Sequence, residues 1–360
     1  MIDRLLTTSM PFLRLALRLV LALPAFLVER ITSGMPPEAS RLAPDQRLIA
    51  HLSHVIGAEE IDEIPVDVQR EQTDSLADLV SIDSRRGGIP LTVTEHTVTG
   101  ADGALRLRLY RPRPPVPEAG PRPLLVWLHG GGWVAGSVAS HDLSLRHLAR
   151  LSGVAVATIE YRQAPEHPWP AAPNDVLAAW RDIRSRAASF GTAPEMIMVG
   201  GDSAGGNLAA VLCLDLKAAS EPQPVFQFLL YPVTDLADES PTYEQFAEGY
   251  YLGRSKMRFY RDAYTPDPTV RSDPRVSPLR ADSHEHLAPA WITTSPTDPL
   301  LDEGLAYALK LARAGVPVEE ESFPAIHGWF NLTVSETARA GLSTFAAAVG
   351  AAAGRTHSST

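Results

Sequence analysis

This chain of 360 residues is 45% hydrophobic and 21% charged, and it carries a formal net charge of -10. That length and apolar content are enough for a large buried core, and one α/β domain with a cap accounts for both. The negative charge argues against a nucleic-acid partner, which would need a basic surface. The single cysteine, Cys213, excludes an internal disulfide, and its position in an apolar helix-like segment predicts an inert buried thiol.

Residues 10–28 form an apolar segment that is interrupted by Arg14, Arg18 and two prolines. Two arginines near the centre of a membrane-spanning helix would each cost about 2.5 to 3.5 kcal/mol, which argues against a span. Arginines four residues apart lie on one face of a helix, so the segment has a basic side and a leucine-rich side. Three interpretations stay open: a helix packed on the body or on a second subunit, peripheral contact with a membrane surface, and export. We expect a cytoplasmic protein, with membrane association as the open alternative.

The rest of the chain alternates between strand-like and helix-like segments. The expected strands are 91–98, 105–110, 123–128, 153–159, 196–200, 225–231, 290–294 and 316–323. The expected helices are 143–151, 174–188, 207–219, 303–314 and 335–353. Continuous apolar runs are typical of strands buried in a parallel sheet, whereas the alternating pattern of 91–98 indicates an edge strand. The alternation predicts an α/β sandwich of three layers.

Two regions do not fit this alternation, namely residues 1–86 and an insertion at 236–275 between the sixth and seventh strands. A stretch of 22 residues inside the insertion contains seven of the chain's 25 aromatic residues. Such a cluster either lines a substrate pocket or attaches the insertion to the body, and both interpretations stay open. We therefore expect an N-terminal region, 1–86, and a main domain, 87–360, that contains the insertion.

A serine stands at a predicted strand-to-helix turn, in the sequence Gly201-Asp202-Ser203-Ala204-Gly205. A turn this sharp forces the serine backbone into a strained conformation, and the flanking glycines avoid clashes with the neighbouring strand and helix. The placement directly after the apolar run 196–200 predicts that Ser203 is displayed as a nucleophile.

A glycine-rich loop, His129-Gly130-Gly131-Gly132-Trp133, follows the strand 123–128. Backbone N–H groups in such a loop are uncovered, and each donor aimed at a developing oxyanion is worth roughly 2.7 to 4 kcal/mol of barrier. We expect Gly130 and Gly131, together with Ala204 after the serine, to be these donors. We interpret His129 as a structural residue that orients the loop. A flexible glycine hinge is the alternative.

These motifs, with Tyr161-Arg162-Gln163-Ala164-Pro165-Glu166-His167-Pro168, Asp298-Pro299-Leu300 and His327-Gly328, resemble the hormone-sensitive-lipase-like microbial esterases within the α/β-hydrolases. The matching blocks cover about residues 123–328 in the family's order. The resemblance implies a mostly parallel eight-stranded sheet with helices on both faces and a helical cap made of the two irregular regions. It also implies hydrolysis of short- to medium-chain carboxylic esters without a metal or cofactor. Gln163 departs from the family, which more often has an apolar residue there.

A serine needs a base to take its proton and a carboxylate to orient that base. The chain order of this fold is serine, acid, histidine, and of the histidines after Ser203 only His327 lies in the loop after a predicted strand. Asp298 follows the strand 290–294, at the carboxyl edge where open α/β sheets place their chemistry. Asp302 and Glu303 compete for this role, but they start a helix, where acidic residues favour the dipole. The predicted triad is Ser203, Asp298 and His327.

Pocket and partners follow from the same resemblance. We expect Trp133, Phe246, Tyr250 and Tyr251 to line the substrate pocket. Relatives often dimerise through the edge of the last strand, so the segment 316–323 is the expected homodimer interface. Two alternatives to a serine carboxylesterase are a ligand-binding relative that has lost the histidine and a dehydratase that has threonine for serine. The presence of His327 and Ser203 argues against them.

Overall fold

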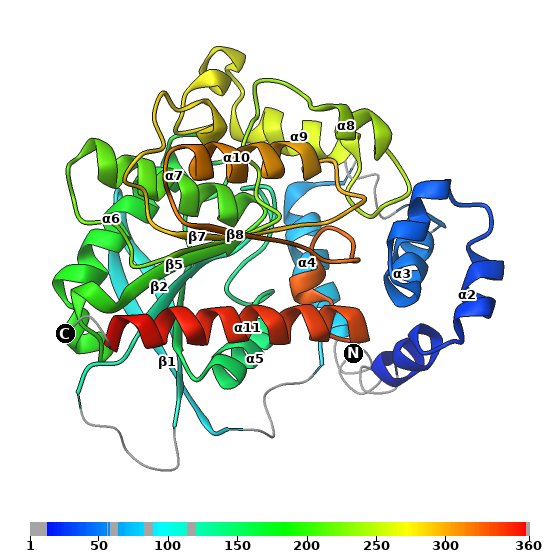
Figure 1. The fold of residues 1–360 in the computed structure, drawn as a ribbon, viewed down its shortest axis with the longest axis horizontal. Helices are drawn as coiled ribbons and strands as arrows, with labels where there is room; N and C mark the ends of the chain where they lie inside the picture. Colours follow the sequence, from blue (N-terminus) through cyan, green and yellow to red (C-terminus); the bar gives the residue numbers. More distant parts are fainter. Residues whose placement is uncertain (1–12, 56, 58–63, 83–88, 114–119, 358–360) are drawn as a thin grey trace.

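The structure is a computed structural model that describes residues 13–55, 57, 64–82, 89–113 and 120–357. Eight strands form one sheet in the order β1-β2-β4-β3-β5-β6-β7-β8. Figure 1 shows this sheet crossing the middle of the molecule. The strands are β1 (Leu91–Gly100), β2 (Gly103–Pro112), β3 (Leu124–Leu128), β4 (Ala155–Ile159), β5 (Ile197–Asp202), β6 (Gln227–Leu230), β7 (Ala290–Thr294) and β8 (Val318–Ser322). The pairs β1–β2 and β2–β4 are antiparallel, and the remaining pairs are parallel. The predicted strands and the α/β class are confirmed.

Helices cover both faces of this sheet. The covering helices are α5 (Asp142–Ser152), α6 (Ala171–Ser185), α7 (Ala204–Ala218), α10 (Leu301–Arg313) and α11 (Glu336–His357). Side chains of α5 and α11 pack into one apolar cluster, and those of α6, α7 and α10 pack into the other. All five predicted helices are therefore confirmed. Helix α7 begins at Ala204 rather than at residue 207, because it starts directly after the turn at Ser203.

Strand β3 shows why these strands are apolar throughout. Leu124 and Val126 belong to the cluster on one face, and Leu125 and Trp127 belong to the cluster on the other. Neighbouring side chains of a strand point to opposite faces, so a strand covered on both sides has no polar positions. The edge strand β8 is different, because its sequence is Val-Glu-Glu-Glu-Ser and its side chains are at least partly exposed. Charged edges of this kind hinder pairing with other chains.

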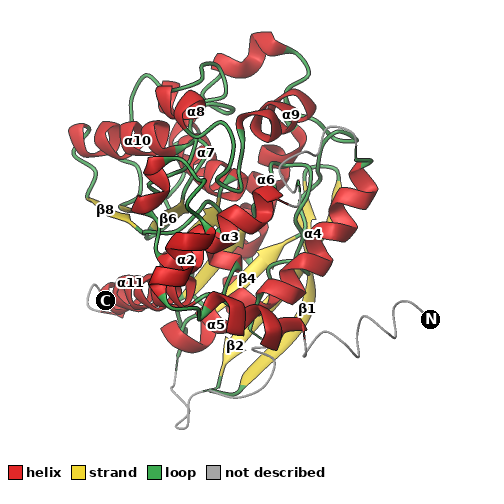
Figure 2. Ribbon diagram, turned by 90° about the vertical axis from the view of Figure 1, so that its right-hand side faces the viewer, coloured by secondary structure: helices red, strands yellow, loops and turns green. Residues whose placement is uncertain are grey.

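The regions that break the alternation form further helices. They are α2 (Ala25–Ile31), α3 (Pro44–Val55), α4 (Val66–Val80), α8 (Pro241–Gln245) and α9 (Arg254–Tyr264). Short 3-10 helices occupy Pro37–Arg41, Ala187–Phe190, Pro194–Met196, Pro268–Ser272, Pro278–Arg280 and Trp329–Asn331. Helices α2 and α3 form one flank of the molecule, and α4 lies between that flank and the sheet (Figures 1 and 2).

Part of the segment 10–28 lies outside the described residues, namely 10–12, and residues 13–21 are helical. Arg14 turns toward α4, where its guanidinium forms an ion pair with the Asp78 carboxylate at 2.9 Å and donates to the Asp78 carbonyl at 2.7 Å. Arg18 is exposed. The expected basic side is therefore split, because one of the two arginines is used to hold the helix on the body. In the part of the chain that the structure describes, no helix is both long and apolar enough to cross a bilayer.

Candidate active site

The turn between β5 and α7 leaves no space for side chains on either side of Ser203. The Ser203 backbone has φ 56° and ψ -118°, a strained conformation for a residue with a side chain. A Cβ on Gly201 would lie 2.4 Å from the Gly205 carbonyl carbon, and a Cβ on Gly205 would lie 1.9 Å from the Leu128 carbonyl oxygen. Both contacts are with backbone atoms, so glycine is required at both positions.

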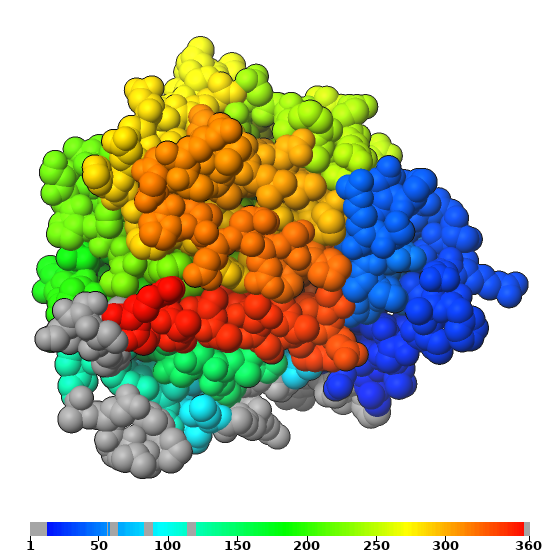
Figure 3. Space-filling view, in the orientation of Figure 1, coloured from blue at the N-terminus to red at the C-terminus, as the bar shows by residue number. Residues whose placement is uncertain are grey.

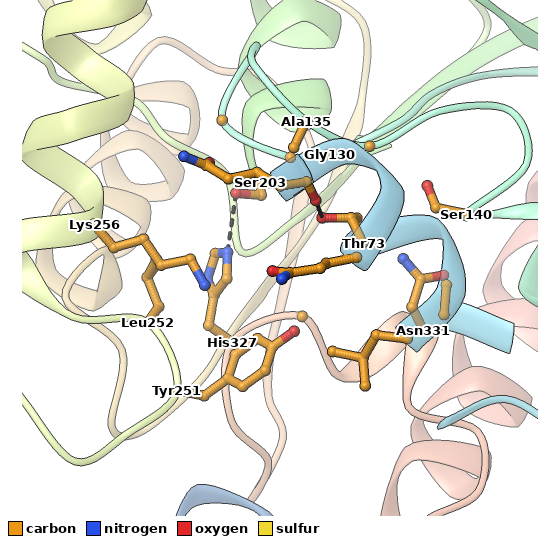
Figure 4. A pocket seen from close by; sticks show the side chains of 18 of the residues that line it. Thr73, Gly130, Ala135, Ser140, Ser203, Tyr251, Leu252, Lys256, His327 and Asn331 are labelled. Carbon is orange, nitrogen blue, oxygen red and sulfur yellow. Dashed lines mark hydrogen bonds between the residues drawn. The ribbon is translucent and has the colours of Figure 1, made fainter. Parts of the chain in front are cut away.

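Three side chains meet at this turn and form a continuous chain of hydrogen bonds. His327 Nε2 lies 2.9 Å from Ser203 Oγ, and His327 Nδ1 lies 2.6 Å from Asp298 Oδ2. Figure 4 shows the contact between Ser203 and His327. The other carboxylate oxygen of Asp298 accepts the Leu300 N–H at 2.9 Å, which fixes the acid in its loop. In this arrangement the Ser203 hydroxyl donates to the imidazole, and the imidazole N–H donates to Asp298.

The two competing acids have other places in the structure. Asp302 and Glu303 lie in the first turn of α10. Glu303 is buried and accepts the backbone N–H groups of Thr234 and Asp235 at 2.6 and 3.2 Å. Burial raises the pKa of the Glu303 carboxyl well above its ordinary value. Its contacts tie α10 to the segment after β6.

The glycine loop is held by close backbone contacts that explain its composition. Gly131 has φ 114°, and a Cβ there would lie 2.0 Å from the Ala135 carbonyl oxygen. Gly132 has φ 62°, and its Cβ would overlap the Tyr260 ring at 2.2 Å. Within the described ranges, no acceptor is paired with the backbone N–H groups of Gly131, Gly132 or Ala204. The N–H of Ala204 has none because it begins α7, where the first N–H groups lack helical partners.

Gly130 differs from the expectation, because its N–H donates to Asp202 Oδ1 at 3.1 Å. An N–H that is paired with a carboxylate is not available to a substrate oxygen, so this contact argues against the predicted role of Gly130 as an oxyanion donor. The same carboxylate oxygen lies 3.1 Å from His141 Nε2. Burial alone would raise the pKa of the Asp202 carboxyl, but His141, His129 and the Gly130 N–H together hold it below its ordinary value. Asp202 therefore joins the serine turn to the glycine loop.

His129 lies beneath the loop rather than beside Ser203. Its Nδ1 is 2.9 Å from the Gly130 carbonyl oxygen, and its ring stacks on Tyr161 with 4.3 Å between centroids. The Tyr161 hydroxyl donates to the His129 carbonyl oxygen at 2.7 Å. Complete burial is the main cause that lowers the pKa of His129. These contacts orient the glycine loop.

The segment 161–168 also supports the glycine loop. The Gln163 amide donates to the carbonyl oxygens of Ala135 and Gly136, at 2.8 and 3.0 Å. An apolar residue at this position would leave those contacts unmade. From α4, the Arg70 guanidinium reaches the Glu166 carboxylate at 2.8 Å. The departure from the family pattern at Gln163 therefore has a structural role.

A cavity of about 260 Å³ opens beside Ser203 and His327 (Figure 4). Of the predicted pocket residues, Tyr251 lines it and the other three do not. Trp133 is buried and stacks on Tyr264 with 4.2 Å between rings, while Phe246 and Tyr250 pack against each other in the core. These three side chains pack against other aromatic rings and therefore do not line the cavity.

Helix α4 forms much of the cavity wall. The sequence did not identify this helix as a lining element. Gln69, Gln72, Thr73, Leu76, Ala77 and Val80 line it from this helix. Leu252, Met257 and Tyr260 line it from the insertion. The spacing of Gln69, Thr73, Leu76 and Val80 follows one face of a helix, a signal that could have found this wall. No group of three or more metal-ligating side chains occurs among the residues that the structure describes.

Comparison with known proteins places this geometry in a family. A family model described as "alpha/beta hydrolase fold" matches residues 125–331. The chain is 41% identical to the carboxylic ester hydrolase LipN of Mycobacterium tuberculosis over 68% of its own length and 66% of that protein's length. The chain belongs to the hormone-sensitive-lipase-like esterases of the α/β-hydrolase fold.

Two further comparisons give the same result. An ethyl acetate hydrolase of Pseudomonas putida is 38% identical over 66% of this chain and 75% of its own length. A solved ester hydrolase from the metagenome of Lake Arreo has a TM-score of 0.80 and 38% identity, and it covers 86% of this chain and 98% of its own. The chain thus spans about two thirds of the length of the first of these curated relatives and three quarters of the second. The ligand-binding and dehydratase alternatives are not favoured.

Proposed function

We propose that this chain is a serine carboxylesterase in which Ser203, His327 and Asp298 form the catalytic triad. The observation that carries the proposal is the unbroken hydrogen-bond chain from Asp298 through His327 to Ser203, ending at a cavity. A buried imidazole that accepts from the serine hydroxyl can take its proton as the oxygen attacks an ester carbonyl. Asp298 then stabilises the imidazolium that forms.

The negative oxygen of the tetrahedral intermediate needs donors that are already in place. Gly131, Gly132 and Ala204 are the proposed donors, because their N–H groups have no intramolecular acceptor within the described ranges. In this proposal Gly132 takes the place of Gly130 as a donor. The Gly130 N–H instead fixes the loop through its hydrogen bond to Asp202. The alcohol leaves with the proton held by His327, which gives an acyl group on Ser203. A water molecule, deprotonated by His327, then releases the acid by the same route.

The size of the cavity supports short- to medium-chain esters as substrates, as the resemblance implies. A cavity of about 260 Å³ accommodates a small ester. The names of two relatives, a carboxylic ester hydrolase and an ethyl acetate hydrolase, support the same class. We propose that residues 1–86 and 236–275 act together as the cap, because helices from both regions line the cavity.

A homodimer through β8 stays a prediction. That edge presents Glu319, Glu320 and Glu321 in succession, and two copies paired there would bring like charges together. Burial, together with Glu320, already raises the pKa of Glu321. We therefore expect any dimer through this edge to strengthen with salt, which light scattering after size exclusion at low and high ionic strength would measure.

Hydrolysis of p-nitrophenyl acetate, butyrate and octanoate tests the proposed function. Ser203→Ala is expected to reduce kcat by roughly 10⁴- to 10⁶-fold, because it removes the attacking oxygen. Thr73→Val is the matched control, since it removes another hydroxyl on the cavity wall. Comparable activity of the wild type and the Ser203→Ala variant across these esters would exclude the proposed nucleophile.

A further inference from the structure

The N-terminal helices carry large apolar side chains on the side away from the body. Six of the fourteen exposed large hydrophobic side chains among the described residues fall within residues 13–31. They are Leu13, Leu15, Leu19, Val20, Phe26 and Ile31, which we call the N-terminal apolar face. Leu19 and Phe26 are 65% and 67% exposed. Single exposed apolar residues are common on protein surfaces, but a concentration of this kind indicates an interaction site.

The opposite side of the same helices already has its partners. Leu21 and Val28 are buried with Leu48 and Val334 in a small apolar cluster. The N-terminal apolar face is therefore not needed to hold these helices in place. In Figure 3 the N-terminal segment, in blue, forms one flank of the molecule, and Figure 2 shows α2 in front of the body when that flank faces the viewer.

Charge distinguishes this flank from the rest of the chain. Residues 13–55 contain five arginines and three carboxylates, a net charge of +2, whereas the whole chain has -10. Arg18 and Arg30 are exposed next to the N-terminal apolar face, together with one carboxylate, that of Glu29. Long arginine side chains can lie along apolar surface and place their charge at its border. A basic border around exposed leucines matches a surface that is apolar inside and negatively charged at its boundary.

We propose that the N-terminal apolar face docks on the anionic surface of a lipid bilayer, with the leucines and Phe26 among the acyl chains and the arginines at the headgroups. Amphipathic helices bind in this way through buried apolar area and attraction to anionic lipids.

The helices that carry the docking surface contact α4, the helix that forms one wall of the cavity. Arg14 binds Asp78 of α4, and Val80 of the same helix both lines the cavity and packs against the cluster of Leu21 and Val28. Docking thus holds the helix that forms one side of the site. Docking at this flank would favour esters that are embedded in the membrane as substrates. That preference rests on the proposed function, whereas binding to lipid does not.

Sedimentation of the full chain with vesicles tests the proposal. Vesicles of equal parts phosphatidylglycerol and phosphatidylcholine are compared with phosphatidylcholine alone. We expect at least tenfold stronger partition into the anionic vesicles and at least a tenfold loss in the triple variant Leu15→Glu, Leu19→Glu, Phe26→Glu. The matched control is Leu305→Glu with Leu309→Glu on α10, where both side chains are also exposed. This control is expected to bind like the wild type.

Circular dichroism and hydrolysis of soluble p-nitrophenyl acetate check that each variant is folded. Four results would overturn the proposal: failure of the wild type to sediment with either vesicle, equal partition into both compositions, equal loss of binding in the α10 control, and unchanged binding of the triple variant. A wild-type dimer that the triple substitution dissociates, without vesicle binding, would assign the face to a second copy. Vesicle binding by a Ser203→Ala variant is expected to be unchanged, so failure of the esterase proposal is distinguishable.

Discussion

The cavity has two sides that are built differently. On the sheet side, the turn around Ser203 and the glycine loop are fixed by backbone contacts, and a single methyl group at Gly201, Gly205 or Gly131 would overlap backbone atoms. On the opposite side, α4 and the insertion present side chains such as Leu76 and Tyr260. Those side chains can change size without moving the main chain. The reactive geometry is therefore rigid, and the substrate-facing wall is adjustable.

One added methyl group should disrupt the serine turn on the sheet side of the cavity. Gly205→Ala would place its Cβ 1.9 Å from the Leu128 carbonyl oxygen, so we expect a loss of more than about 3 kcal/mol of stability or no folded protein. Gly304→Ala is the matched control in α10, where the new Cβ meets only Thr294 at 3.5 Å. The control is expected to gain about 0.5 to 1 kcal/mol. Thermal unfolding measures both, and equal melting temperatures would contradict the account.

Asp202 joins the serine turn to the glycine loop, and its substitution should have a smaller effect, on catalysis rather than on folding. Asp202→Asn keeps an acceptor for the Gly130 N–H but removes the charge beside His141, so we expect kcat to fall by roughly 10- to 100-fold with little change in KM. Asp102→Asn is the control, since Asp102 is 81% exposed in a surface ion pair with Arg162. Equal kinetics for the two variants would show that Asp202 does not position the oxyanion donors.

The adjustable side should change selectivity rather than chemistry. Leu76→Ala removes apolar surface from the α4 wall, and we expect the ratio of kcat/KM for p-nitrophenyl octanoate to that for the acetate to fall roughly three- to tenfold. Leu309→Ala, on the exposed face of α10, serves as the control. A uniform loss for both esters would mean that this wall supports the rigid side instead.

The smallest effect concerns a cluster of ion pairs within the insertion. Glu239 accepts from Arg254 and Arg258 of α9, and chiefly the Arg258 hydrogen bond lowers the pKa of its carboxyl from 4.5 to about 2. Because the folded pKa is the lower one, the stabilisation is complete above pH 4.5 and is lost as the pH falls toward 2. Glu239→Gln should therefore lower the free energy of unfolding by about 1 kcal/mol at neutral pH. The difference from the wild type should be smaller in high salt and should shrink progressively below pH 4.5.

Unfolding in denaturant at several pH values measures this difference. Glu244→Gln is the control, because Glu244 pairs with the same Arg254 while being 79% exposed. A difference between wild type and Glu239→Gln that did not shrink in acid would contradict the assigned cause.

The two sides also differ in how far the sequence could predict them. The strands, the serine turn and the residues of the proposed triad follow from local patterns, because turns with little space restrict the residues that fit. The sequence could not show that Gly130 differs from the other two glycines of the loop, because only the folded structure pairs its N–H with Asp202. Trp133, Phe246 and Tyr250 were misplaced because composition does not say whether a ring faces a cavity or another ring. The α4 wall depends on contacts such as Arg70 with Glu166, 96 positions apart, which no local pattern reveals.

Intact-mass analysis after treatment with diethyl p-nitrophenyl phosphate tests the central claim most directly. This reagent transfers a diethylphosphoryl group to an activated serine and releases p-nitrophenol. The account predicts one adduct per chain, located on the peptide that contains Ser203, with loss of ester hydrolysis in proportion to the adduct. It also predicts no adduct in His327→Ala. Full hydrolysis with Ser203 unmodified, or an adduct on another residue that accounts for the loss of activity, would contradict it.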